Sequence, residues 1–167
     1  MRYTILGILG LAGAMGFMVP ACTVAPSEPV VSEDYTLRQE HDSLYWLNEW
    51  RLPYPVYRFC TGDVNGDGQV NAIVGVIKST RFHPEVGRRI FIFKQVGGKV
   101  RPLWLGSRLG GTLVDFCFVD GRIRALETDR RGMYGVVEYQ WEDFGMYFHH
   151  LIIKDTDEET ALKYFEL

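Results

Sequence analysis

Short stretches in which apolar and polar residues alternate dominate the chain after its first third. Four strand-like stretches follow one another between Val56 and Ser107, and four more lie between Thr112 and Ile153. One of the first four, "VNAIVGVIKS", is β-branched and apolar, which predicts a buried strand. Alternation with a period of two is typical of β-strands, whose successive side chains point to opposite faces. Gly97-Gly98 and Asp120-Gly121 separate neighbouring stretches, and such pairs favour two-residue hairpins. The pattern predicts a mainly β protein with two consecutive four-stranded antiparallel meanders.

Each predicted meander is propeller-blade-like, but two blades cannot close a propeller ring, which takes four or more. We therefore expect the two units to stack as a sandwich, to close as a small barrel, or to use a partner. Each arrangement would bury the aromatic strand faces. The last residues, 154–167, begin acidic and end apolar, which predicts either a short helix or a final edge strand.

The segment "YTLRQEHDSLYWLNEWRL", residues 35–52, has a different pattern. Ser32 or Asp34 can cap a helix here, and Pro53 and Pro55 would end it. A rough helical stripe is formed by Leu37, Leu44, Leu47 and Arg51. This spacing predicts a short N-terminal helix before the first meander.

The first residues are typical of an export signal. Arg2 precedes an apolar run, Tyr3–Val19, that suits a secretory signal better than a spanning helix. The run leads into "VPAC", which ends at Cys22 and resembles the lipobox of bacterial lipoproteins. In that family the signal is cut before the cysteine, which then carries lipid on its sulfur and its new amino terminus.

The lipobox resemblance implies a signal peptide over residues 1–21 and a lipid anchor at Cys22. The alternatives are an ordinary secretory signal cut near Ala21 or Ala25, and an uncleaved anchor. By the sorting rule of enteric bacteria, Thr23 after the cysteine implies the outer membrane. The whole chain is also similar to uncharacterised envelope lipoproteins of Bacteroides-type bacteria.

After the signal, the composition divides the chain into a tether and a domain. Residues 22–33 are small, polar and proline-bearing, which predicts a flexible tether. Residues 34–167 are long enough for a single β-rich domain with a core of its own.

The charge distribution limits the kinds of binding partner that the chain can have. The net charge is −3, but residues 78–131 alone carry +7. A basic middle can face anionic head groups or an acidic partner, although arginines that alternate along strands also solvate a sheet face. We expect no nucleic-acid partner, because an exported lipoprotein rarely meets one.

With Cys22 lipidated, an exported chain keeps Cys60 and Cys117, which predicts either a disulfide between them or two separate buried thiols.

One loop carries oxygen ligands in a cation-binding pattern. It opens the stretch "TGDVNGDGQVNAIVGV", which begins at Thr61. Calcium prefers several carboxylate, amide and backbone oxygens. An EF-hand needs glutamate at position twelve, where this chain has Val74. The candidate ligands are the side chains of Asp63, Asn65, Asp67 and Asn71 and the backbone carbonyl of Gln69.

Because strands are predicted on both sides, this loop resembles the calcium loops of FG-GAP and VCBS-type β-propeller repeats. The resemblance covers Tyr57 to Ser107 and implies a structural calcium ion. Those repeats usually carry Asp where Asn71 stands, which implies weak calcium binding. The alternative is a turn of Gly, Asn and Asp that its own side chains hold.

Other candidate residues point less clearly to chemistry. His149 and His150 are adjacent on a predicted strand, so we expect them to point to opposite faces and not to share a metal. Four tryptophans and nine tyrosines can form either a sugar-stacking platform or core packing. The stretch "STRFHPEVGRR" reads as an irregular exposed loop, where function often lies. The predicted partner-binding residues in this loop are Arg81, Phe82, His83, Arg88 and Arg89.

No nucleophile elbow, phosphate loop or dinucleotide fingerprint occurs in the sequence. We therefore expect a non-catalytic lipoprotein of the bacterial cell envelope that presents a β-rich domain to an envelope protein partner. The alternative is an envelope lipoprotein that binds glycans through aromatic side chains, with or without calcium.

Overall fold

The computed structural model describes residues 22–24, 29–32, 34–81, 83–106 and 109–167. The predicted signal peptide, residues 1–21, lies outside the described residues. The strands are β1 (Cys22–Val24), β2 (Val30–Val31), β3 (Thr36–His41), β4 (Leu44–Leu47), β5 (Trp50–Leu52), β6 (Val56–Gly62), β7 (Asn71–Thr80), β8 (His83–Val96), β9 (Lys99–Leu105), β10 (Thr112–Val119), β11 (Arg122–Thr128), β12 (Tyr134–Glu142) and β13 (Gly145–Thr156), followed by the helix α1 (Glu158–Phe165).

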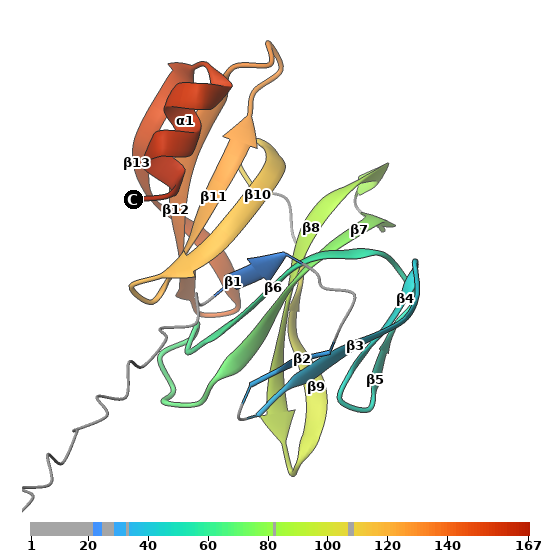
Figure 1. The fold of residues 1–167 in the computed structure, drawn as a ribbon. Helices are drawn as coiled ribbons and strands as arrows, with labels where there is room; N and C mark the ends of the chain where they lie inside the picture. Colours follow the sequence, from blue (N-terminus) through green and yellow to red (C-terminus); the bar gives the residue numbers. More distant parts are fainter. Residues whose placement is uncertain (1–21, 25–28, 33, 82, 107–108) are drawn as a thin grey trace, which may run out of the picture.

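Three antiparallel sheets make up the fold (Figure 1). The central sheet is the meander β6-β7-β8-β9, and the short strand β1 adds to its β6 edge. The second sheet is the meander β10-β11-β12-β13, and the third is the small sheet β2-β3-β4-β5. The mainly β class and the two four-stranded meanders are thus confirmed. Strands β1 and β2 lie within the stretch predicted as a tether.

The predicted N-terminal helix is wrong, because residues 35–52 fold into strands β3, β4 and β5. Two tight turns, at Asp42-Ser43 and Asn48-Glu49, interrupt the segment. At the second turn Asn48 adopts a φ of 51°, and its side-chain oxygen accepts a 2.7 Å hydrogen bond from the Thr36 N–H. The buried side chains follow strand alternation instead of a helical stripe; they are Tyr35, Leu37, Tyr45, Leu47 and Leu52.

The predicted hairpins form where the sequence places them. Gly97 and Gly98 have φ values of 58° and 72°, and Asp120 and Gly121 have 50° and 76°. Positive φ at both central residues is typical of the tight turns that match strand twist. Pro102 lies on β9, the edge strand of the central sheet, next to a register shift. Both observations agree with the sequence, since proline cannot donate to a sheet ladder.

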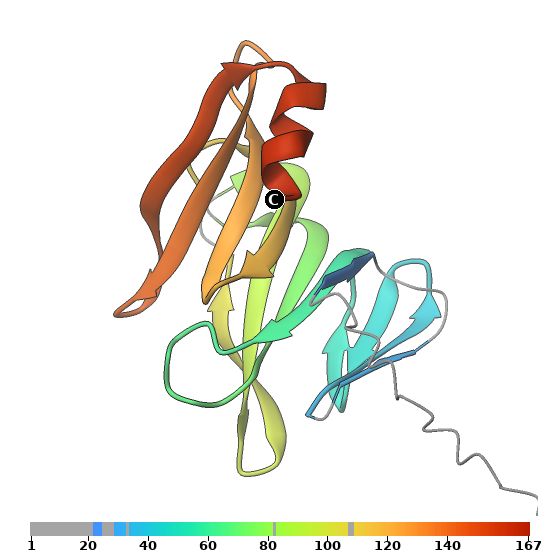
Figure 2. The ribbon, with the colours of Figure 1, turned by 60° about the vertical axis from the view of Figure 1, so that its left-hand side comes forward.

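The central sheet is buried on both faces, which explains its almost continuous apolar runs. On β7, Val74 and Val76 pack toward the small sheet, whereas Ile73 packs toward the second meander. On β8, Phe93 and Ile92 divide in the same way. The two meanders therefore stack face to face, as one of the expected arrangements requires, with the small sheet as a third layer (Figure 2).

Helix α1 covers the outer face of the second meander (Figures 1 and 2). Its buried Ala161 and Phe165 contact Leu126 and Val136. Asp157 caps the helix by accepting a 2.9 Å hydrogen bond from the Thr160 N–H. Of the two predictions for the C-terminal residues, the helix is confirmed. Among the described residues, no helix is long and apolar enough to cross a membrane.

Candidate functional site

The predicted calcium loop connects β6 and β7 and is held by its own hydrogen bonds. The two carboxylate oxygens of Asp63 accept hydrogen bonds from the N–H groups of Asp67, at 3.2 Å, and Gly68, at 2.9 Å. Asn65 donates to the Asp67 carboxylate at 2.9 Å. This bond is the largest cause that lowers the pKa of Asp67. The geometry is the self-held turn expected as the alternative to calcium.

Asn71 occupies a different environment from the other predicted calcium ligands. Its side chain is fully buried, and its oxygen accepts a 3.0 Å hydrogen bond from the Val64 N–H. Its side-chain nitrogen has no hydrogen-bond partner among the described residues. The side-chain oxygen of Asn65 is also buried and accepts no hydrogen bond among the described residues, whereas Asp67 and Gln69 are exposed. The calcium site stays a prediction.

Neither alternative predicted for Cys60 and Cys117, a disulfide between them or two separate buried thiols, is correct. Cys117 is a free cysteine, whereas Cys60 is disulfide-bonded. Alternation explains why the two do not meet. Cys60 lies in the layer between the two meanders, and Cys117 lies on the opposite face of the second meander, beside α1. Burial raises the pKa of the Cys117 thiol. In the backbone register, Cys22 stands directly opposite Cys60.

The residues predicted to bind a partner do not form an irregular loop. Strand β7 ends at Thr80 and β8 begins at His83, so most of the stretch belongs to one long hairpin. Backbone pairing between β7 and β8 continues to Thr80 and His83, so the strands extend beyond their apolar part. Arg81 is exposed at the turn, and Phe82 lies outside the described residues.

Three of these residues line a cavity of about 360 Å³, together with Trp104 and Leu113. The three are His83, Arg88 and Arg89. Arg88 donates a hydrogen bond to the Val114 carbonyl and lies over the Tyr57 ring, 4.8 Å from its centroid. Its guanidinium therefore connects the two meanders.

Three of the four tryptophans pack in the core and do not form an exposed platform. Trp104 is buried between the meanders, and Trp141 packs against the same cluster. Trp50 packs on the other side of the central sheet, 6.0 Å from the ring of Phe93. These three rings serve core packing, which the sequence allowed as the alternative to sugar stacking.

A second cavity, of about 450 Å³, contains a buried carboxylate that the sequence did not single out. Glu127 is only 5% exposed, and burial is the main cause that raises its pKa. Its carboxylate accepts hydrogen bonds from the Tyr139 hydroxyl, at 2.8 Å, and from the Gly111 N–H, at 2.6 Å. The Tyr139 hydroxyl in turn accepts a 2.8 Å bond from the Gly110 N–H.

This network ties the link before β10 to the second meander. A Cβ atom at Gly111 would lie 2.8 Å from a Glu127 carboxylate oxygen, so the close approach requires glycine. Both carboxylate oxygens and the tyrosine hydroxyl are already used. Gly110 and Gly111 therefore donate their backbone N–H groups to the buried side chains of Tyr139 and Glu127. The sequence does contain a sign of this buried carboxylate, because Glu127 shares its alternating strand face with the apolar Ile123 and Ala125 in "RIRALETD".

The wall of this cavity continues onto an exposed apolar edge. Strand β13 is the last strand of its sheet. Phe148 and Leu151 line the cavity and are 63% and 39% exposed. Tyr147 on the same strand and Phe144 in the preceding turn are also exposed. An edge strand offers unpaired backbone groups, and exposed apolar side chains along it mark an interaction surface.

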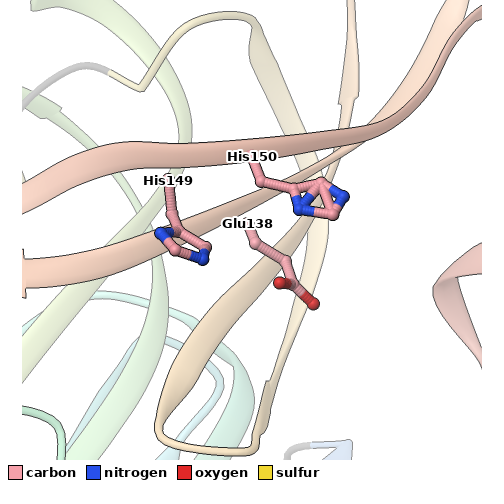
Figure 3. Close-up of side chains that lie close together, drawn as sticks. All are labelled: Glu138, His149 and His150. Carbon is pink, nitrogen blue, oxygen red and sulfur yellow. The ribbon is translucent and has the colours of Figure 1, made fainter.

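On the other face of the second meander, three potential metal ligands converge (Figure 3). Glu138 pairs with His150, and Tyr139 pairs with Phe148, so His149 is an extra residue in a β-bulge. The bulge brings the rings of His149 and His150 to a centroid separation of 6.1 Å. The expectation that they point to opposite faces is therefore wrong, because it assumed a regular strand.

Comparisons with known proteins add no relative. No protein-family model, curated protein or solved structure matches this chain.

Proposed function

We propose that this protein is a lipid-anchored, non-catalytic component of the bacterial cell envelope that binds a protein partner along β13. The observation that carries the proposal is the exposed apolar edge beside a cavity. An extended segment of a partner can add to such an edge as a further strand. Main-chain hydrogen bonds then supply affinity, and side chains that enter the cavity beside Phe148 and Leu151 supply specificity.

A photocrosslinking amino acid at Phe148 in the native envelope tests the interface. The expected result is one captured protein at this position and none from a probe at Val96, which is 52% exposed on the β8–β9 hairpin. Phe148→Ser should lower the affinity for the captured protein at least about tenfold, the loss expected for a buried interface aromatic. Equal capture from both probes, or none from either, would contradict the proposal.

Lipid attachment at Cys22 places the domain at a membrane, and several acyl chains hold a protein there firmly. Cys22→Ser should release the protein into the soluble fraction. The second readout is the intact mass of the protein extracted from the envelope. The Cys22 sulfur can form either a thioether to lipid or a disulfide, but not both, and the two differ in mass. Membrane retention of the variant, or a mass without lipid, argues against the anchor. Outer-membrane placement is tested by fractionation.

Glycan binding remains the alternative function. Tyr147 and Phe148 would then stack on sugar rings, as exposed aromatic side chains do. A glycan array with the purified domain separates the two functions, because a specific glycan signal lost in Phe148→Ser would replace the protein partner.

A further inference from the structure

We propose that Glu138, His149 and His150 form a binding site for a divalent transition-metal cation of the zinc class. Each residue offers one ligand atom, and these atoms lie within 4.8 Å of one another. Two imidazole nitrogens and one carboxylate oxygen are a ligand set that zinc takes when its remaining positions stay open. The ligand side chains lie on the other face of the sheet from the cavity beside Phe148, although both sites use β13.

The backbone fixes the three side chains on adjacent strands. Glu138 comes from β12, and both histidines come from β13. Figure 3 shows the two rings on either side of the Glu138 carboxylate. Zinc–ligand bonds of about 2.0–2.1 Å at tetrahedral angles separate ligand atoms by about 3.3 Å. The rings therefore need to move inward by at most about 1.5 Å, which side-chain rotation supplies.

Hydrogen bonds hold the carboxylate in a position suited to a ligand. Glu138 is only 8% exposed, and its Oε1 accepts hydrogen bonds from Arg124 at 3.0 and 3.2 Å. Ligating carboxylates are commonly held by such outer hydrogen bonds. Oε2 lies 4.0 Å from the nearest Arg122 nitrogen, beyond hydrogen-bond distance. This second oxygen is therefore the one available to a cation.

The charge around the site sets its strength and its metal preference. Arg122 and Arg124 flank the single carboxylate, so they repel a cation and lower its affinity. With three ligands, the site should bind zinc more weakly than four-ligand structural sites do. Imidazole ligands favour zinc-class metals, whereas calcium and magnesium prefer oxygen ligands. Both histidines are solvent-accessible, which leaves a path for the metal.

The test is calorimetric titration of the tag-free domain with zinc from about 1 to 100 μM, the range of a binding free energy near 6–8 kcal/mol. The visible absorption spectrum of the domain with Co²⁺ in place of zinc shows independently whether nitrogen ligands bind the metal. We expect one bound zinc per chain. His149→Ala and His150→Ala should each weaken binding at least about tenfold. His41→Ala, an exposed histidine outside the site, should bind as the unchanged domain does.

Glu138→Gln should weaken zinc binding in the same way, but it also breaks the ion pair with Arg124 and can lower stability. The surface histidine variants therefore decide the outcome, and circular dichroism shows that they fold. Absence of zinc binding over this range overturns the proposal. Binding that is unchanged in both histidine variants overturns it as well.

Discussion

The Arg58 guanidinium donates hydrogen bonds to both carboxylate oxygens of Asp115 and thereby joins β6 to β10 across the two meanders. The bond from Nε to Oδ1 is 2.9 Å long. The two side chains are 18% and 20% exposed, so solvent screens this pair less than a surface pair. Asp115 also accepts a 2.8 Å bond from the Phe116 N–H, which fixes the carboxylate beside the interface.

Asp115→Asn should destabilise the domain by about 2 kcal/mol, because it leaves the half-buried Arg58 without its anionic partner. Urea unfolding measures the change. The matched control is Glu159→Gln, which removes the exposed pair with Lys163 on α1 and should cost at most about 0.5 kcal/mol. Equal effects of the two variants would show that the Arg58–Asp115 pair does not hold the meanders together.

Gly75→Ala should destabilise the domain by about 1–3 kcal/mol through overpacking. An added Cβ would lie 2.8 Å from the Tyr57 ring and 2.9 Å from the Phe116 ring, where the two meanders meet. Gly87→Ala is the control, because its Cβ would meet only the mobile end of Arg89, at 3.0 Å. Thermal melting distinguishes them, and an unchanged melting temperature for Gly75→Ala would contradict the tight packing of this layer.

Glu127 should make stability depend on pH. Burial raises the pKa of Glu127 in the folded state above its unfolded value, so the folded protein binds more protons than the unfolded one. The contribution of Glu127 is therefore present at acid pH and is lost as pH rises through the folded-state pKa. We expect the stability of the unchanged domain relative to Glu127→Gln to fall as pH rises from about 4 to 7, a window that begins near the ordinary glutamate pKa. A difference that stays constant over this range would sink the prediction.

Calcium should raise the melting temperature if the loop between β6 and β7 binds it, because a ligand of the folded state alone stabilises that state. Extracellular calcium sites work at about 0.1–1 mM, so the titration extends to a few millimolar. Asp63→Asn should abolish the shift, whereas Asp143→Asn, in the β12–β13 turn, should keep it. A melting curve that neither calcium nor a chelator changes would leave the loop as a self-held turn.

Local patterns were enough to predict eight of the strands. Hairpins at Gly97-Gly98 and Asp120-Gly121 depend only on neighbouring residues, and their positive φ values follow from those residue types. The helix prediction for residues 35–52 was wrong because the positions of Leu37 and Leu47 fit a helical stripe as well as strand alternation. The two-residue turns at Asp42-Ser43 and Asn48-Glu49 divide this segment into strands. These residue pairs indicate a hairpin less strongly than Asp-Gly or Gly-Gly does.

The sequence by itself determined the mainly β class, the strand order of both meanders and the positions of their tight turns, because these depend on residue type and spacing along the chain. The tertiary structure alone decided which faces meet. It separated Cys60 from Cys117 and buried Glu127 against Gly111. A single extra residue brought His149 beside His150. Alternation assigns a side chain to one of two faces, but only packing between sheets determines what covers each face, and one bulge reverses the assignment.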